Sequence, residues 1–472
     1  MDGGFDWQVL ARLPLAEAVL TLARWVIGVD HLLDRSYQEH RGRCHSRVLS
    51  FPQFVRILFD CLSRPWKSAR AGLLKAQDEG RLPVSPRAFY DKLKRTPVAV
   101  SLAFFRDGVQ RLQAVAPEHR PGCPRSLQGF QTLLLDGKVV KHVCRRLQQL
   151  RLCKATACKL LGPRSLVVAD RWSGLLLDLV VDLDGEANEV KYVGPLLQRV
   201  QASVPGPFLM VGDRAFGIFA VCQQISAAAG EFLVRQHGGS VFVPDPQRSA
   251  VTSRDRFGRT VTQRWGWLVR GKETQRTPRP QIPVRQLTVQ RSTTTLVLLT
   301  SLLDAQAYAV DDLLDSYLAR WDIEGMFQKV TDVFHLRHLF STTPQGMLFQ
   351  LVLAFLMHNL IQVVKQVIVQ EQGREEAQVS TAMLFRDIQE ELISVTRLLS
   401  PEAVVDLLRD WPSPEAVRQR LHQLLKGRWC NRWAKANYRP RNPARLIKPQ
   451  PSKLRQRKSH DSVQRILLRD QQ

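Results

Sequence analysis

The sequence predicts an α/β fold with a mixed sheet, flanked by helical regions and interrupted by a β-rich segment. From Gln131 onward, short apolar runs alternate with amphipathic segments, which is typical of an α/β layout. Helical apolar spacing dominates the first 125 residues. Residues 237–295 differ, because they are rich in Arg, Gln, Thr and Pro and contain alternating β-like runs. The expected organisation is a helical N-terminal region (1–125), a core in two parts (126–236 and 296–372), a β insertion (237–295) and a helical C-terminal region with a basic tail (373–472).

Composition indicates a globular, strongly basic protein with a polyanionic partner. Hydrophobic residues make up 44% of the 472, which supports packed cores, and this length predicts about two to four domains. The formal net charge of +25 makes nucleic acid the expected partner, with an anionic membrane surface as the competitor. Residues 426–472 hold 14 Lys or Arg against two Asp, which favours a phosphate-binding arm over a merely solvated tail.

Neither secretion nor a membrane span is expected. The N-terminus carries Asp2 and Asp6 where a secretory leader would be basic. The least charged run of the sequence lies between Arg337 and Lys365. A buried helix over 347–364 explains this run better than a membrane span does, because the run contains many polar residues. Eight cysteines without a Cys-x2-Cys pair indicate free thiols in a reducing compartment. Three cysteines cluster near His142 but match no common zinc module: Cys144, Cys153 and Cys158.

Two helix starts are visible in the N-terminal region. Ser50 precedes an apolar segment over 51–59, and Ser85-Pro86 opens a helix that Pro97 should end. The second helix is short and basic, so it is a candidate to dock on DNA as in a helix-turn-helix. An ordinary solvated amphipathic helix is an equally weighted alternative. Its candidate DNA-binding residues are Arg87, Lys92, Lys94 and Arg95.

Two apolar strand-like runs each end in an acid, at Asp136 and at Asp213. A single Asp at a strand end is most often a turn residue. Acids at several strand ends, however, lie where open α/β sheets place their ligands. The accompanying elements are expected as strands at 165–170, 174–182 and 231–235, helices at 187–202 and 216–229, and a strand at 295–300 that returns to the core.

A later helix is expected to present a third acid. Tyr317, Arg320 and Glu324 are spaced by three and four residues, so on one helix they would share a face. The alternative is an ordinary surface Arg–Glu pair. Asp311 and Asp312 favour a helix start upstream. The expected apolar stripe of this helix consists of Ile323, Phe327, Val330 and Phe334.

Together, Asp136, Asp213 and Glu324 form a candidate triad. Carboxylates are preferred ligands of Mg²⁺ and Mn²⁺, and three of them close together would repel each other without a metal. Two such ions about 3.5–4 Å apart can activate a water or a 3′-hydroxyl and stabilise the leaving oxygen. The triad therefore predicts metal dependence.

These residues resemble a family, the DDE-type insertion-sequence transposases with the YREK signature, which includes bacterial cut-and-paste transposases. The resemblance extends from about residue 85 to 450. It rests on Leu-Leu-Leu-Asp136-Gly, Val-Gly-Asp213-Arg-Ala-Phe-Gly, Phe-Leu-Val-Arg235, and Tyr317-x2-Arg320-Trp-x-Ile-Glu324-x2-Phe. The resemblance implies an RNase H-like core and a reaction in which the transposon ends are nicked and the freed 3′-hydroxyl is then joined to target DNA by strand transfer. It also implies that the triad holds two Mg²⁺ or Mn²⁺ ions and that the protein acts as a homodimer in a synaptic complex on double-stranded DNA. The location that it implies is the bacterial cytoplasm, in association with the nucleoid.

The resemblance also assigns DNA contacts. Tyr317 and Arg320 would contact a phosphate, but the signature expects Lys where this chain has Thr331, so we expect weaker end binding with chemistry retained. Some relatives stabilise a flipped base with a tryptophan of the insertion, which makes Trp265 and Trp267 candidates, although sheet packing suits at least one of them. Candidate DNA-binding residues of the basic tail are Arg439, Arg441, Lys453 and Arg455.

Two other functions stay open at this stage. One is a transposase-derived DNA-binding protein without catalysis, which the complete acid triad disfavours. The other is a different RNase H-like nuclease such as a junction resolvase, which the Tyr–Arg–Glu spacing and the β insertion disfavour. The helical region 376–425 is a candidate surface for a partner subunit.

Overall fold

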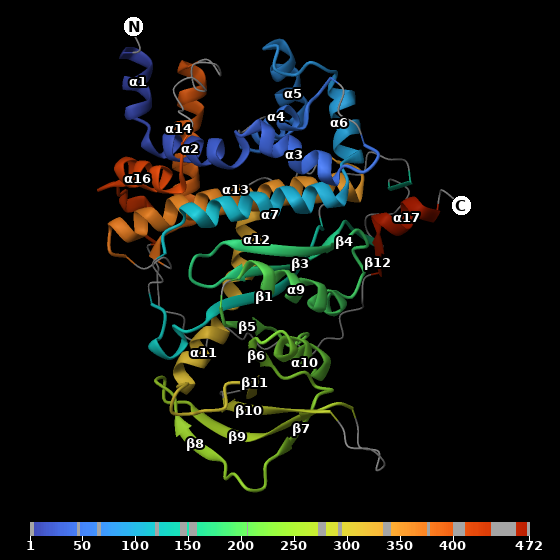
Figure 1. The fold of residues 1–472 in the computed structure, drawn as a ribbon, viewed down its shortest axis with the longest axis vertical. Helices are drawn as coiled ribbons and strands as arrows, with labels where there is room; N and C mark the ends of the chain where they lie inside the picture. Colours follow the sequence, from blue (N-terminus) through green and yellow to red (C-terminus); the bar gives the residue numbers. More distant parts are fainter. Residues whose placement is uncertain are drawn as a thin grey trace.

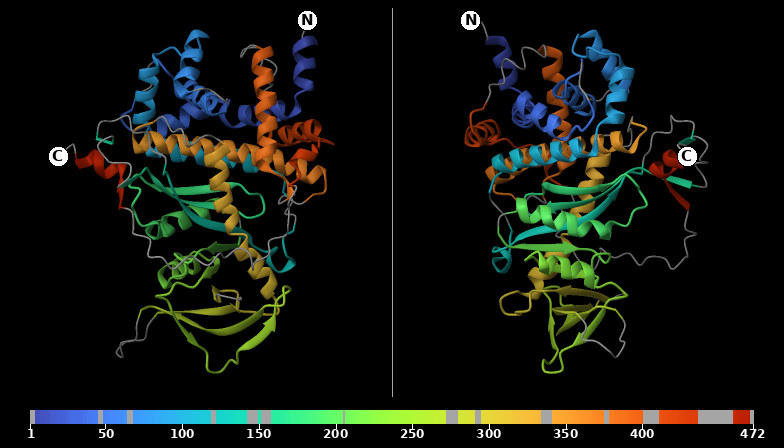
Figure 2. Two further views of the ribbon diagram at one scale, coloured as in Figure 1. Left: turned by 180° about the vertical axis from the view of Figure 1, so that it is seen from behind. Right: turned by 45° about the vertical axis from the view of Figure 1, so that its right-hand side comes forward.

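The computed structural model stacks three parts: a helical layer, a central α/β core and a β-rich lobe at the opposite end (Figure 1). The two further views keep the same stacking, with the core between the other two parts (Figure 2). The structure describes residues 4–44, 48–63, 68–118, 122–141, 149–150, 158–204, 206–271, 280–290, 295–333, 341–374, 378–399, 411–435 and 459–469.

The N-terminal region is helical, as predicted. Ser50 and Ser85 cap their helices as expected, since their hydroxyls accept hydrogen bonds from the backbone N–H of Gln53 and Ala88, both at 3.3 Å. The elements are α1 (Gly4–Ala11), α2 (Pro14–Ile27), α3 (Asp30–His40), α4 (Phe51–Ser63), α5 (Ala69–Asp78), α6 (Pro86–Arg95), α7 (Val98–Val115) and the short η1 (Arg125–Leu127).

The core sheet has the RNase H-like arrangement. Its strands are β1 (Gln131–Val139), β3 (Arg164–Asp170), β4 (Leu176–Asp182), β5 (Phe208–Gly212) and β6 (Glu231–Arg235). They lie in the order β4-β3-β1-β5-β6, with β1, β5 and β6 parallel and β3 antiparallel to both neighbours. Three helices belong to this unit: η2 (Glu189–Tyr192), α9 (Val193–Ser203) and α10 (Phe219–Ala227). This order confirms the predicted fold class and the predicted hairpin around residues 171–173.

The first strand is longer than predicted. The sequence suggested that it ends at Asp136, but β1 continues to Val139 because β3 pairs with it as far as Arg164. The parallel pairing with β5 does stop at Leu135 opposite Gly212. Asp136 therefore lies inside β1 but at the end of its parallel pairing.

The β insertion extends the core sheet instead of forming a separate one. Strand β11 (Thr295–Thr300) pairs antiparallel with β6, as the predicted return strand should. Beyond it the sheet continues through β10 (Gln281–Gln290), β9 (Thr260–Val269) and β7 (Val241–Pro244), and β8 (Val251–Arg254) also pairs with β9. The strands of the insertion therefore belong to the same sheet as β6, the strand that follows the second acid.

Helices after the sheet close the core. They are α11 (Val310–Leu318), α12 (Trp321–Val333), α13 (Pro344–Glu371), α14 (Thr381–Leu398), α16 (Pro414–Leu425), η5 (Asn431–Trp433) and α17 (Val463–Arg469). Near the end of the chain, β12 (Ser459–Ser462) pairs parallel with β2 (Cys158–Leu161). The candidate partner surface at 376–425 is partly engaged within the chain, because α14 and α16 both pack against α2.

Helix α13 is the central helix of the molecule. By length and composition it is able to cross a membrane, but its apolar window is entirely buried in the protein, which agrees with the predicted core helix. It packs along α7, and Asn359 on it clamps β4. The Asn359 side chain accepts from the N–H of Leu176 at 2.9 Å and donates to the carbonyl of the same residue at 2.8 Å. This bidentate contact fixes the helical layer to the edge strand of the core.

Candidate active site

Two of the three predicted acids are neighbours at one edge of the core sheet. Leu135 and Gly212 are opposite each other on the parallel strands β1 and β5, and Asp136 and Asp213 are the next residues of the two strands. Adjacent strands lie about 4.8 Å apart, so the two carboxylates start from neighbouring backbone positions. Each Asp also accepts a local backbone hydrogen bond: Asp136, inside β1, accepts from the N–H of Gly137 at 2.9 Å, and Asp213 accepts from the N–H of Ala215 in the following turn at 2.7 Å.

The third acid comes from a helix that packs on β1. Helix α12 lies against this strand, and Lys138 on β1 donates to the carbonyl of Phe327 at 3.3 Å. The stripe residues Ile323, Phe327 and Val330 are buried as predicted, whereas Phe334 lies outside the described residues. Packing of this stripe leaves the side chain of Glu324 half exposed beside the sheet edge.

The Tyr–Arg–Glu group does not lie on one continuous helix. Tyr317 is in the last turn of α11, Glu324 is in the first turn of α12, and Arg320 lies in the turn between the two. The backbone still turns tightly, because Arg320 N–H donates to the Tyr317 carbonyl at 3.1 Å and Ile323 N–H donates to the Arg320 carbonyl at 3.2 Å. The predicted proximity therefore holds although the predicted single helix is wrong.

Arg320 is the buried centre of the site. Its guanidinium donates to the carboxylate of Glu324 at 2.8 Å, and the Arg320 side chain is only 7% exposed while that of Glu324 is 50% exposed. Burial lowers the pKa of Arg320, but attraction to Tyr317, Glu324 and Asp136 outweighs it and the pKa is raised overall. The Nε of Arg320 is buried and has no hydrogen-bond partner within the described ranges. A buried donor of this kind favours an anionic partner.

Asp136 is held in an unfavourable environment for a charged carboxylate. Burial raises its pKa to about 7, and the negative charges of Glu324 and Asp213 push in the same direction. The charge of Arg320 and the N–H of Gly137 oppose this shift. Because the charges of Arg320, Glu324 and Asp213 all affect the pKa of Asp136, these four side chains lie close enough to interact electrostatically.

The three acids suit a hard divalent cation by their chemistry. They supply only carboxylate oxygens, which are the ligands that Mg²⁺ and Mn²⁺ prefer, and the desolvated Asp136 would gain from a nearby positive charge. In the part of the chain that the structure describes, no three His, Cys, Asp or Glu side chains already form a metal cage. The carboxylate of Glu324 is paired with Arg320 at 2.8 Å.

Tyr317 and Arg320, which the resemblance assigns to a phosphate contact, are both buried. Tyr317 is 3% exposed, and burial raises the pKa of its hydroxyl. Arg235 and Asp213 act on the same hydroxyl, which places it near both strand ends. The Thr331 backbone belongs to α12, but its side chain lies outside the described part of the structure.

A basic shelf next to Asp213 was not assigned by the sequence. It consists of Arg214 in the loop after β5, Arg235 at the end of β6 and His237 in the loop after β6, and Arg214 and His237 are exposed. The two loops are packed together, because the carbonyl of Gly217 accepts from the N–H of His237 at 3.1 Å. The motifs around Asp213 and Arg235 contain two of these residues. His237 carried no signal of its own, because only the parallel pairing of β5 and β6 brings the loops together.

The predicted stacking residues lie mainly in the sheet. Trp265 is 8% exposed and donates from its indole N–H to the carbonyl of Leu303 at 2.7 Å, so it is a packing residue. Trp267 on the same strand is half-buried opposite Val243. The packing of Trp265 agrees with the sheet role expected for at least one of the two tryptophans, and base stacking by them stays a prediction.

The basic helix α6 presents only part of its predicted surface. Arg87 and Arg95 are exposed, whereas Lys94 pairs with Asp91 at 3.3 Å. Lys92 is directed inward: it donates to the carbonyl of Leu49 at 2.8 Å, and burial lowers its pKa to about 8. Lys92 thus stabilises the helical layer. The predicted tail contacts Arg439, Arg441, Lys453 and Arg455 lie outside the described residues, as do Cys144 and Cys153 of the cysteine cluster.

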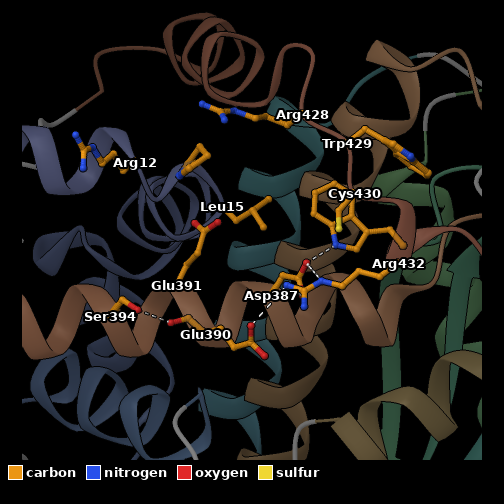
Figure 3. A pocket seen from close by; sticks show the side chains of 12 residues that line it. Arg12, Leu15, Asp387, Glu390, Glu391, Ser394, Arg428, Trp429, Cys430 and Arg432 are labelled. Atoms are coloured by element: carbon orange, nitrogen blue, oxygen red, sulfur yellow. Dashed lines mark hydrogen bonds and ion pairs between the residues drawn. The ribbon is translucent and has the colours of Figure 1, made fainter.

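A pocket of about 380 Å³ lies between α2, α14 and residues 428–433 (Figure 3). Its carboxylates serve internal contacts: Asp387 accepts from Arg432 at 2.8 Å and from the indole of Trp433 at 2.6 Å. Glu391 accepts from the N–H of Ala16 at 2.9 Å at the start of α2. The pocket contains none of the three acids, and its contacts join the start of α2 to α14 and to residues 428–433.

One family model and several solved structures are similar to this chain. Residues 130–360 match the family model described as a transposase DDE domain. A solved piggyBac transposase synaptic complex with hairpin DNA is similar over 90% of this chain and 88% of that chain, at 12% identity and a TM-score of 0.42. No curated protein matches the chain. The matched segment covers slightly less than half of the protein and includes all three acids, so the family match supports a DDE transposase.

Proposed function

We propose that this protein is a DNA transposase that cleaves the ends of a mobile element and joins the freed 3′-hydroxyl to target DNA. The observation that carries the proposal is the placement of the acids: Asp136 and Asp213 follow paired positions of parallel strands, and Glu324 lies on a helix packed against the first strand. All three fall within the segment that matches the transposase DDE domain.

Each acid would have a distinct task in binding metal. Asp136 and Asp213 start from rigid sheet positions, so they would hold divalent cations in fixed places. Glu324 is half exposed on α12 and would complete the site after turning away from Arg320. Bound Mg²⁺ or Mn²⁺ would activate the attacking water or 3′-hydroxyl and stabilise the leaving oxygen.

Arg320 and the basic shelf would position the phosphodiester. When Glu324 turns away, Arg320 keeps a buried positive charge that a phosphate oxygen can neutralise, and its free Nε supplies a further donor. Arg214 and His237 are exposed next to Asp213, so they would hold the backbone on the other side of the acids. The net charge of +25 would draw DNA toward the protein without sequence preference.

A cleavage assay tests this proposal. The substrate is a labelled duplex that carries the inverted repeat flanking the coding region, incubated with purified protein and Mg²⁺. We expect wild-type protein to nick the repeat end, Asp213→Asn to lose at least a hundredfold in rate, and EDTA to abolish the reaction. Asp322→Asn is the matched control, since this acid lies on α12 but pairs with Arg171 at 3.3 Å. Equal cleavage by wild type and Asp213→Asn would refute the proposed site.

A DNA-binding protein without catalysis is the second candidate. Two observations favour it: Glu324 is bound to Arg320, and Thr331 replaces the lysine that the resemblance predicts. A gel-shift and cleavage comparison separates the two functions. If wild type and Glu324→Ala both bind the repeat end and neither cleaves it with Mg²⁺ or Mn²⁺, the binding function is the correct one.

A further inference from the structure

The tip of the β8–β9 hairpin presents an aromatic ring to solvent. Phe257 is 42% exposed, which is unusual for a ring in a chain whose other phenylalanines pack mainly in cores. Two arginines flank this ring: the guanidinium carbon of Arg256 lies 4.9 Å from its centroid and that of Arg259 lies 5.4 Å away. The combination of an exposed ring and adjacent guanidinium groups suits a partner with both flat apolar surface and negative charge.

The turn that holds Phe257 is rigid. The carboxylate of Asp255 accepts from the N–H of Phe257 at 3.0 Å, from the N–H of Arg259 at 2.9 Å and from the Nε of Arg259 at 2.6 Å. Gly258 takes a φ of +75°, a conformation that L side chains rarely adopt. The ring is therefore held outward before any partner binds, which reduces the entropy lost on binding.

The hairpin is also fastened to the helix that leads to the active site. The N–H of Arg256 donates to Asp311 at 3.1 Å, and its guanidinium pairs with Asp315 at 2.5 Å. Asp315 lies three residues before Leu318, the last residue of α11, which corresponds to about 5 Å along this helix, and Arg320 lies in the turn that follows. This separation is much shorter than one turn of duplex DNA, about 34 Å, so one duplex can reach both places. Figure 1 shows β8 beside α11.

The charge around the ring is positive. Arg254, Arg256 and Arg264 are exposed, and Arg259 is partly exposed. Asp255 pairs with Arg259 and Asp315 pairs with Arg256, so among the described residues Arg254 and Arg264 are the arginines here whose charge no acid balances. Exposed arginines beside an apolar ring complement a phosphate backbone flanking a base step.

We propose that this hairpin tip, residues 254–259, is a second contact with double-stranded DNA, in which Phe257 wedges against a base step and the arginines bind the adjacent phosphates. The inference rests on the proposed function, because it assigns the same DNA to the tip and to the acids. It gives the β insertion a direct role in holding the substrate.

A binding experiment without chemistry tests the tip. The probe is a fluorescein-labelled duplex of 40 base pairs carrying the repeat end, titrated in EDTA at several salt concentrations. Phe257→Ala should weaken binding on the order of tenfold without changing the salt slope, because it removes an apolar contact and no charge. Arg254→Gln should lower the salt slope by about one, because it removes one phosphate contact. Phe257→Trp should bind like wild type.

Val251→Ala is the matched control, since Val251 lies on the same hairpin, is 47% exposed and has none of these arginines against it. It should bind like wild type. Equal affinity of Phe257→Ala and wild type overturns the inference, as does a change in oligomeric mass in place of a change in affinity, which would assign the tip to a second copy of the chain. The assay contains EDTA, so it measures DNA binding without cleavage. If DNA binding depends on Phe257 but the protein fails to cleave DNA in the separate cleavage assay, only the proposed catalysis is refuted.

Discussion

Replacing Asp136 by Asn should make the protein more stable while it destroys the site. In the native protein burial raises the pKa of Asp136 to about 7 from an ordinary value of 3.8, a difference of about 3 pH units. Each unit corresponds to about 1.4 kcal/mol, so charging this carboxyl costs the native state up to about 4 kcal/mol relative to the unfolded chain. Asn has nearly the same shape and no charge to desolvate.

The pH dependence has a definite sign. Below pH 4 Asp136 is protonated in both states, so wild type and Asp136→Asn should unfold at similar temperatures. Between pH 4 and 7 the unfolded chain loses its proton first, so wild type loses stability relative to the variant as the pH rises. Above pH 7 the difference should be constant, at several degrees in melting temperature.

Thermal denaturation in EDTA from pH 4 to 8 measures this difference. Asp184→Asn is a control of opposite sign: although burial opposes it, hydrogen bonds and Arg465 lower the pKa of Asp184, so this variant should be less stable than wild type at pH 8. Adding Mn²⁺ should stabilise wild type but not Asp136→Asn, because only the charged site binds metal. A variant that is less stable than wild type at pH 8, or equally stable at every pH, would refute the reasoning.

Three further predictions concern single contacts. Ser85→Ala should lower the free energy of unfolding by about 1 kcal/mol in chemical denaturation, because it removes the cap of α6. Asn359→Ala should lower it by about 2–4 kcal/mol, because the backbone N–H and carbonyl of Leu176 lose their buried partner, and equal stability would contradict the clamp. Thr331→Lys should tighten DNA-end binding several-fold in a fluorescence titration, and it should raise by about one the slope of log affinity against log salt concentration. Unchanged binding would show that residue 331 does not contact the DNA.

Local patterns were sufficient to predict most elements of the core. Apolar runs bounded by turn residues located β3, β4, β5 and β6, and serine caps located α4 and α6. The length of β1 was underestimated because Asp136 and Gly137 resemble a strand end, whereas β3 extends the strand through long-range pairing. Pairing of this kind has no local sequence signal.

The site was predictable in identity but less so in detail. Spacing alone brought Tyr317, Arg320 and Glu324 together, and the turn at Arg320 preserved that proximity even though it divides the helix. Spacing did not indicate that Arg320 is buried, since burial depends on the sheet edge beneath it. The period-two spacing placed Trp265 and Trp267 on one side of a strand, but it did not indicate that the indole of Trp265 would be bonded to the carbonyl of Leu303.

Mapping the bound metal tests the central claim most directly. In place of Mg²⁺, Fe²⁺ is added with ascorbate and peroxide, so that hydroxyl radicals cut the polypeptide next to the bound ion, and the fragments are identified by mass spectrometry. We predict cuts close to Asp136, Asp213 and Glu324 in wild type, all suppressed by excess Mg²⁺ and all lost in Asp213→Asn. Cuts confined to other parts of the chain, or an unchanged pattern in Asp213→Asn, would contradict the proposed metal-dependent site.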